Sequence, residues 1–279
     1  MHTKNEKQRI ERLKSSPAYV RAYEDLAFLH REDLRPVRLQ LELMKPELHL
    51  QEQGITSTVV VFGSTRTLER AEIKPILKNL EQRAAASPKN ASLAAELART
   101  RRLLAKSKYY DEAREFARMV SSTCQLDGQC DYVIVTGGGP GIMEAANRGA
   151  YDVGGKSIGL NITLPEEQFP NPYITPELCF QFHYFGLRKM HFLKRARALV
   201  AFPGGYGTLD ELTETLCLVQ TRKIEPIPIV LVCESFWRRA LDVEFLAEEG
   251  MIAPEDREII AYAETAPEIW KIIQDFHRT

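Results

Sequence analysis

The chain has 279 residues, of which 44% are hydrophobic and 27% are charged, and its formal net charge is −1. These values are typical of a globular protein and exclude a disordered chain, a collagen and a small disulfide scaffold. The nearly neutral charge argues against nucleic-acid binding by the whole surface. A chain of this length can bury one full hydrophobic core.

The sequence contains no predicted membrane span, secretory signal or metal site. Its longest apolar stretches, such as 227–233, are far shorter than the roughly 20 residues that cross a bilayer. The N-terminus is charged and has no apolar run. The cysteines are five in number, and Cys124 and Cys130 are too far apart for a zinc-binding pair. We therefore expect a cytoplasmic protein with no metal and no disulfide framework.

Residues 1–53 are predicted to be helical. Tyr19, Tyr23, Leu26 and Leu29 recur at helical spacing, and charges of both signs surround them. We interpret this segment as an N-terminal helical extension that packs on the main domain or on a second subunit.

A β-branched run at 58–62 predicts a buried strand, and the segment 66–110 then interrupts what would be a short connection to the next helix. This insert has eleven lysines and arginines and only four acidic residues. Its leucine and alanine spacing predicts helices. Two interpretations remain, a solvated helical surface or a surface for anions or an acidic partner.

Short apolar runs alternate with helical segments along the rest of the chain. Strands are predicted at 58–62, 132–135, 157–160, 198–202 and 228–232, and helices at 110–121, 142–149, 185–196, 209–220, 236–249 and 255–279. This alternation is typical of a parallel sheet with helices on both faces. We therefore expect residues 54–279 to form one α/β domain, with a doubly wound parallel sheet.

Three glycine-containing loops follow predicted strands, at 63–65, 137–141 and 204–208. In a doubly wound sheet, ligands bind beyond the carboxyl ends of the strands. Glycine allows backbone N–H groups to approach an anion, and the N-terminus of the following helix adds partial positive charge. The spacing matches neither a dinucleotide fingerprint nor a Walker loop. The three loops together predict a phosphate cradle, to which Thr208 adds a hydroxyl.

Two pairs of charged residues lie next to these loops. Asp210 and Glu211 are in the first turn of the helix that follows 204–208. Carboxylates are common there, but one of them could also orient or deprotonate a water. Arg188 and Lys189 are on the helix that leads into the fourth strand. They are interpreted either as a solvated surface or as ligand contacts.

Three motifs together resemble the LOG (Lonely Guy) family of nucleoside 5′-monophosphate phosphoribohydrolases, which was long mislabelled lysine decarboxylase. They are the segment 137–147, the pair Arg188-Lys189 followed by Phe192, and the segment 203–211. The resemblance extends over about 55–275. It implies a Rossmann-like fold, no cofactor, and a homodimer or higher homo-oligomer with active sites near the interface.

The resemblance also implies the reaction, in which the N-glycosidic bond of an AMP-like nucleotide is hydrolysed to free base and ribose 5-phosphate. Arg188 and Glu211 are the implied catalytic pair. The implied substrate-binding residues are Ser64, Gly138, Glu167, Lys189, Gly204, Gly205, Tyr206, Gly207, Thr208 and Asp210.

Some features depart from the family pattern. Cys217 stands where a threonine is common, and Ile142-Met143-Glu144 replaces the Leu-Met-Gly of the plant cytokinin enzymes. The extension 1–53 and the insert 66–110 are absent from those shorter enzymes. Cytokinin riboside monophosphates are therefore candidate substrates beside general purine or pyrimidine nucleotides.

Three other functions are alternatives for this sequence. A nucleotide sensor would use the same crevice without hydrolysis, because fold alone does not define function. A pyridoxal phosphate-dependent decarboxylase would need a Schiff-base lysine and a partner for the pyridine nitrogen, and we find no local pattern for these. The basic insert could bind nucleic acid or a polyphosphate regulator. We expect a nucleoside monophosphate and a second copy of the chain as partners, with no nucleic acid and no membrane.

Overall fold

The computed structural model describes residues 3–125, 128, 130–165 and 169–278. The chain divides into two units, residues 1–47 and 48–279. The division falls inside helix α3 (Arg35–Glu52).

The first unit is helical. It contains α1 (Lys4–Lys14), α2 (Leu26–Leu29) and most of α3. Helix α1 begins at a capping box, in which the Thr3 hydroxyl accepts a hydrogen bond from the Glu6 N–H and the Glu6 carboxylate accepts one from the Thr3 N–H. Most of the segment is therefore helical, but Tyr19 and Tyr23, whose spacing predicted one helix with Leu26, lie between α1 and α2.

The second unit is built on a sheet of seven parallel strands in the order β4-β3-β2-β1-β5-β6-β7. The strands are β1 (Thr58–Phe62), β2 (Val133–Thr136), β3 (Ser157–Ile162), β4 (Cys179–Phe182), β5 (Ala196–Ala201), β6 (Ile229–Val232) and β7 (Ile260–Ala263). The chain adds strands in one direction up to β4 and then returns to place β5 beside β1. This reversal confirms the doubly wound, Rossmann-like fold class.

Two edge strands were missed by the sequence prediction. The sequence predicts no element at β4, and β7 lies within 255–279, for which the sequence predicts helix throughout. Both strands have four residues, and each has a neighbour on one side only. Gln181 interrupts the apolar residues of β4. The apolar residues of β7 adjoin helix α12 (Ala266–Arg278), and the helical periodicity of that segment hid the strand.

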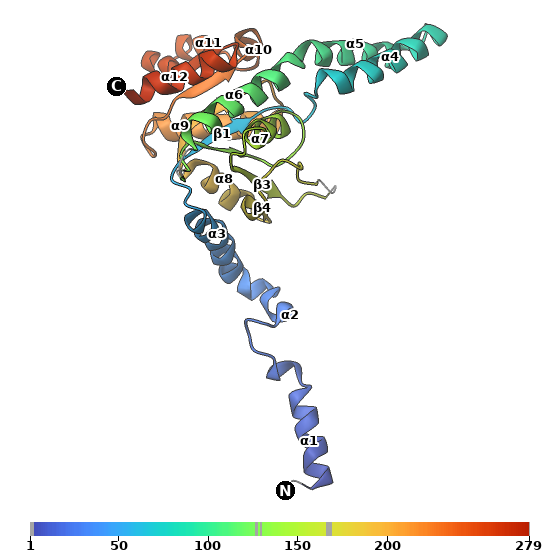
Figure 1. Ribbon diagram of the computed structural model, residues 1–279, viewed down its shortest axis with the longest axis vertical. Helices are drawn as coiled ribbons and strands as arrows, with labels where there is room; N and C mark the ends of the chain where they lie inside the picture. Colours follow the sequence, from blue (N-terminus) through green and yellow to red (C-terminus); the bar gives the residue numbers. More distant parts are fainter. Residues whose placement is uncertain (1–2, 126–127, 129, 166–168, 279) are drawn as a thin grey trace. The chain divides into compact units, whose positions relative to one another are not determined.

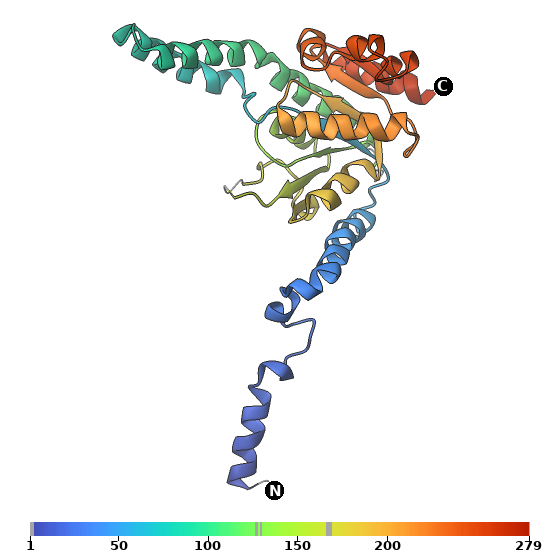
Figure 2. The same ribbon diagram turned by 180° about the vertical axis from the view of Figure 1, so that it is seen from behind.

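Helices cover both faces of the sheet. One face packs against α6 (Lys108–Cys124), α7 (Ile142–Tyr151) and α12. The other packs against α8 (Phe185–Leu193), α9 (Tyr206–Gln220), α10 (Glu234–Ala240) and α11 (Val243–Glu248). Figures 1 and 2 show these layers from opposite sides.

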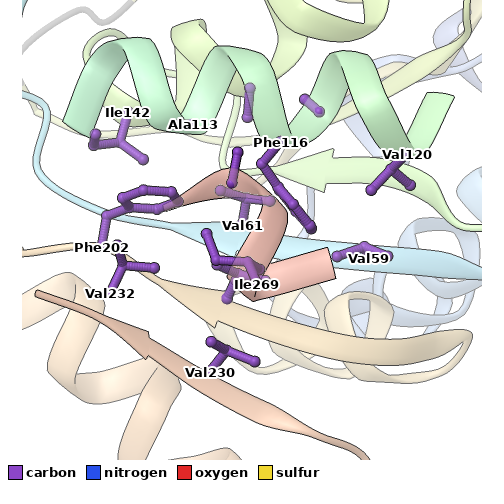
Figure 3. Close-up of a cluster of buried hydrophobic side chains, with 14 of the residues drawn as sticks. Val59, Val61, Ala113, Phe116, Val120, Ile142, Phe202, Val230, Val232 and Ile269 are labelled. Atoms are coloured by element: carbon purple, nitrogen blue, oxygen red, sulfur yellow. The ribbon is translucent and has the colours of Figure 1, made fainter. Parts of the chain in front are cut away.

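Alternation along the strands explains the two layers. In β1, Val59 and Val61 point to the sheet face that α6, α7 and α12 cover, and Figure 3 shows them beside Phe116 of α6. Val60 and Phe62 point to the opposite face, which α8 to α11 cover. Successive side chains of a strand point to opposite faces, so an all-apolar strand needs cover on both sides.

The basic insert forms a helical hairpin of α4 (Arg70–Ala86) and α5 (Ala91–Lys106). The two helices lie side by side and project from the sheet (Figures 1 and 2). Arg101 of α5 forms an ion pair with Glu81 of α4 at 3.0 Å, and at the base of the hairpin Glu69 pairs with Arg148 of α7 at 3.0 Å.

Within the part of the chain that the structure describes, no helix combines the length and apolar character needed to cross a membrane.

Candidate active site

The site lies where the sheet reverses its strand order, at the carboxyl ends of the adjacent strands β1 and β5. The loops that follow these strands are joined by a hydrogen bond from the Ser64 N–H to the Pro203 carbonyl at 3.1 Å. The Phe202 N–H donates to the Phe62 carbonyl at 2.9 Å. Since ligands of doubly wound sheets bind at this switch point, the geometry agrees with the predicted location.

A pocket of about 660 Å³ opens at this edge. Nine of the residues that were predicted from the sequence line it, namely Ser64, Arg188, Gly204, Gly205, Tyr206, Gly207, Thr208, Asp210 and Glu211. They come from the loops after β1 and β5, from α8 and from the first turns of α9. The volume lies in the range of small-molecule sites.

The cradle is the segment 204–208 at the N-terminus of α9. Gly205 is the N-cap residue, and its carbonyl accepts from the Thr208 and Leu209 N–H groups at 3.0 Å each. The N–H groups of 205–207 precede these two donors and have no earlier helical turn to accept from them, and such N–H groups make a helix N-terminus an anion site. A Cβ added at Gly205 or Gly207 would meet no atom of the chain within 4 Å. The protein therefore leaves open space in front of these two residues.

Arg188 is fixed beneath this pocket. Its Nε donates to the Leu160 carbonyl at 2.7 Å, and its guanidinium carbon lies 5.1 Å from the centre of the Phe192 ring. A Cβ at Gly137 would lie 2.6 Å from Nη2, so the guanidinium occupies space that only glycine leaves free. Burial lowers the pKa of Arg188, while the charges of Glu211 and Asp210 oppose that shift. The group stays cationic because an arginine pKa starts far above neutrality.

Glu211 is the most deeply buried acid that lines the pocket, with 6% of its surface exposed. Burial raises its pKa to about 7, and the positive charges of Lys189 and Arg188 limit the rise. A carboxyl group with this pKa exchanges its proton near neutral pH, which is the property of a general acid or base.

Lys189 lies outside the pocket lining, among three carboxylates of α9. Its Nζ is 2.8 Å from Asp210, 3.1 Å from Glu214 and 3.8 Å from Glu211. Burial lowers the pKa of Lys189, but the hydrogen bonds to Asp210 and Glu214 outweigh this effect and leave the pKa raised. The structure therefore places this ammonium against the acidic residues of α9, whereas the resemblance implied that it lines the substrate site.

The glycine-rich loop 137–141 also lies outside the pocket lining, but it packs against Ser64 and Arg188, which line the pocket. Asn171 donates from its side chain to the carbonyls of Gly138 and Gly139, and the Gly138 N–H donates to the Thr136 hydroxyl. Gly141 has φ +74°, and a Cβ there would lie 2.3 Å from the Ser64 carbonyl oxygen. The loop can therefore pack directly against the loop after β1.

Glu167, the remaining predicted substrate contact, lies outside the described residues. Several pocket-lining residues were not predicted, among them Arg66, Leu103, Lys106, Met143, Phe185 and Phe236. Arg66 and Met143 adjoin predicted loops and could have been proposed from that position. Leu103 and Lys106 belong to the insert, and no periodicity signals that the end of a hairpin returns to the sheet edge.

No group of three or more histidines, cysteines or acidic residues is arranged to hold a metal ion among the residues that the structure describes.

The sequence is similar to a known protein family and to several enzymes. Residues 143–273 match a family model described as "Possible lysine decarboxylase". The chain is 30% identical over 177 residues to cytokinin riboside 5′-monophosphate phosphoribohydrolase LOG3 of Arabidopsis thaliana, an alignment that covers 61% of this chain and 77% of the relative. It is 28% identical over 180 residues to the probable enzyme LOGL3 of Oryza sativa subsp. japonica, with 61% and 78% covered.

Among solved structures, a molybdenum cofactor binding protein from Rippkaea orientalis matches 60% of this chain and 87% of its own, at 17% identity and a TM-score of 0.44. The family follows from the sequence relatives. Because the chain is 30% identical to relatives of which it covers more than three quarters, it belongs to the LOG family.

Proposed function

We propose that this protein hydrolyses the N-glycosidic bond of nucleoside 5′-monophosphates and releases the free base and ribose 5-phosphate. The observation that carries the proposal is the pairing, in one pocket, of an anion cradle with a buried carboxyl group whose pKa is about 7. The activity for which the relatives are named, phosphoribohydrolysis of cytokinin riboside 5′-monophosphates, supports the same reaction class.

The cradle supplies the binding energy. The 5′-phosphate would accept hydrogen bonds from the backbone N–H groups of 205–207 and from the Thr208 hydroxyl, in the space that Gly205 and Gly207 leave open. This contact is remote from the reacting bond and holds C1′ of the ribose at a fixed place.

Glu211 would act at C1′. Cleavage of the C1′–N bond builds positive charge on the ribose, as in glycoside hydrolysis, and an ionised carboxylate beside it stabilises that charge. The carboxylate of Glu211 also takes a proton from the water whose oxygen bonds to C1′. The electrons of the C1′–N bond leave with the base, which takes a proton from solvent water, and Glu211 then releases to solvent the proton that it accepted.

Arg188 would position the substrate and stabilise it in the pocket. Its high pKa makes it a poor proton donor, so its role is to donate hydrogen bonds to the substrate from a guanidinium already fixed by Leu160 and the Phe192 ring.

The resemblance to other family members extends the proposal to a homodimer. Tyr206, 92% exposed beside the pocket, is a side chain that a second subunit could cover.

The test is product analysis. The protein is incubated with a panel of nucleoside 5′-monophosphates that includes cytokinin riboside monophosphates, and chromatography detects free base. Nucleosides and nucleoside triphosphates are the controls. Release of base from one or more monophosphates supports the proposal and ranks the bases.

No release by folded protein would refute it. Tight AMP binding without release would instead identify a nucleotide sensor, and a bound chromophore in the absorbance spectrum of the purified protein would point to a pyridoxal phosphate enzyme.

A further inference from the structure

The helical hairpin contributes a cation to the pocket. Lys106, at the end of α5, lines the pocket together with Leu103 of the same helix. Its ammonium lies 5.3 Å from the centre of the Phe236 ring, and its side chain is half-buried. The aromatic face holds the ammonium at the pocket wall by a cation–π contact.

Neither Lys106 nor Arg66, a second pocket-lining cation, is neutralised by the protein. Within the described part of the chain, no carboxylate oxygen lies within 4.0 Å of either charged group, whereas the neighbouring Arg101, Lys108 and Arg148 all have acidic partners. Of the pocket acids, Asp210 is bound by Lys189 at 2.8 Å. Both acids that line the pocket, Asp210 and Glu211, lie within 4.0 Å of Lys189, so the two positive charges of Lys106 and Arg66 face a ligand-sized space without an ion-pair partner of their own among the described residues.

The strand order brings these two cations to the edge of the sheet that carries the cradle. The cradle follows β5, which lies between β1 and β6. Arg66 is in the loop after β1, and its N–H donates to the Ser64 hydroxyl at 3.0 Å. Phe236, which holds Lys106, is in α10 directly after β6. Arg66 and Lys106, called here the basic wall, thus lie beside the segment 204–208 at the same edge of the sheet.

We propose that the basic wall is a phosphate-binding subsite that the hairpin adds to the active-site pocket. This inference rests on the proposed function of the pocket. A phosphate oxygen is the ligand that matches two unneutralised cations beside helix N–H groups, because charge-assisted hydrogen bonds to phosphate are strong and a half-buried cation gains most from an anionic partner. The phosphate can come from the 5′-phosphate of a monophosphate or from a second phosphate linked to it.

The experiment compares AMP with ADP on the full chain. The test variants are Lys106→Gln, which keeps the length and removes the charge, and Arg66→Gln. Lys106→Arg restores the charge. Arg102→Gln removes one charge from the same helix at a residue that does not line the pocket, and serves as the control. Thermal unfolding checks that each variant is folded.

We expect Lys106→Gln to raise KM about tenfold with little change in kcat. The reason is that the lost hydrogen bond to phosphate is equally strong in the ground state and in the transition state. Lys106→Arg should return KM to within about threefold of the starting value, and Arg102→Gln should leave it unchanged. A rise for both nucleotides assigns the wall to the 5′-phosphate. A rise for ADP alone assigns it to the second phosphate.

The inference is overturned if Lys106→Gln and Arg66→Gln leave KM for both nucleotides within about twofold, or if Arg102→Gln raises KM as much as they do. Should the protein release base from neither nucleotide, the proposed function fails, but the wall is still tested by calorimetric titration with AMP, ADP and inorganic pyrophosphate. About tenfold weaker binding by Lys106→Gln supports the wall, and unchanged binding overturns it.

Discussion

At the scale of single residues, the candidate chemistry depends on one buried carboxyl group and the two cations that act on it. Burial raises the pKa of Glu211 to about 7, and the positive charges of Lys189 and Arg188 limit that rise. Lys189 touches no part of the pocket lining but lies 3.8 Å from Glu211. It is therefore a positioning residue in this account, which acts through the charge state of Glu211.

A pH profile tests this role. If Glu211 acts as a carboxylate, kcat should rise with pH through about 7, because only the ionised form stabilises the ribose cation and accepts a proton. Lys189→Met removes a charge that lowers the pKa of Glu211 and should move the midpoint to higher pH. The titration of the substrate phosphate is the same for both proteins, so the difference between their profiles belongs to the enzyme. Identical midpoints would remove Lys189 from this role.

The ionisation of Glu211 should also lower the free energy of unfolding as the pH rises, whereas it raises kcat. The unfolded state loses the Glu211 proton near its ordinary pKa of 4.5, whereas the folded state retains it until about pH 7. The unfolded state therefore binds fewer protons between these values, and the contribution of Glu211 to stability, complete below pH 4.5, is lost as the pH rises through 7. Glu211→Gln cannot ionise and should be more stable than the unmodified protein at pH 8 by up to about 3 kcal/mol.

The measurement is denaturant unfolding of both proteins at pH 5 and pH 8. Other titrating groups cancel in the difference between the two proteins. A stability difference that is the same at both pH values would show that Glu211 ionises normally in the folded state.

At the scale of elements, local patterns predicted the central strands and the site loops well. Runs such as 58–62 and 198–202 are buried on both faces and read as continuous apolar segments. Gln181 breaks the apolar run of edge strand β4, and the apolar run of β7 is hidden by the helical pattern of the adjoining α12. Helix α9 begins at Tyr206, three residues earlier than predicted, because residues that form an anion cradle at a helix N-terminus look like loop residues in sequence.

The hydrogen bonds from Asn171 that hold the glycine-rich loop 137–141 could not be predicted from local sequence pattern. Asn171 lies 33 residues from Gly138, and only the folded sheet brings its amide to the carbonyls of the glycine-rich loop. The same amide donates to Asn147 at 2.9 Å. Such a buried network depends on long-range contacts, for which a single sequence has no periodic signal.

Asn171→Ala should therefore act on stability and activity together. It leaves two buried carbonyls and the Asn147 amide oxygen without this donor, and should lower the free energy of unfolding by about 2–3 kcal/mol. It should also lower kcat, because the loop packs against Ser64 and Arg188. Gln181→Ala, at an exposed amide on β4, is the control and should change neither quantity. Normal stability of Asn171→Ala would exclude the network as a support.

At the scale of the whole molecule, the pocket belongs entirely to the second unit. All of its lining residues lie between Phe62 and Phe236. The first unit instead exposes large apolar side chains, including Tyr19, Tyr23 and Leu26. The sequence predicted both the extension and the insert as helical, but only the structure shows that the insert reaches the pocket.

Deletion of residues 1–34 tests this division while keeping α3 intact. The truncated protein should remain folded, with kcat/KM within about threefold of the full chain, because no pocket residue is removed and the sheet keeps both helical layers. Light scattering on the same samples reports the oligomeric state. Loss of activity by a folded, truncated protein of unchanged oligomeric state would show that the extension takes part in the site.

The central claim is that Glu211 performs hydrolysis in a pocket that binds nucleotide by other groups. The most direct measurement compares the full chain with Glu211→Gln on the preferred monophosphate, by calorimetric binding and by chromatography of released base on the same samples. Glu214→Gln, one turn further along α9 and also bound to Lys189, is the matched control. We predict that Glu211→Gln keeps Kd within about threefold and loses at least about a thousandfold in kcat, with Glu214→Gln near normal. Turnover by Glu211→Gln within about tenfold of the full chain would contradict the account.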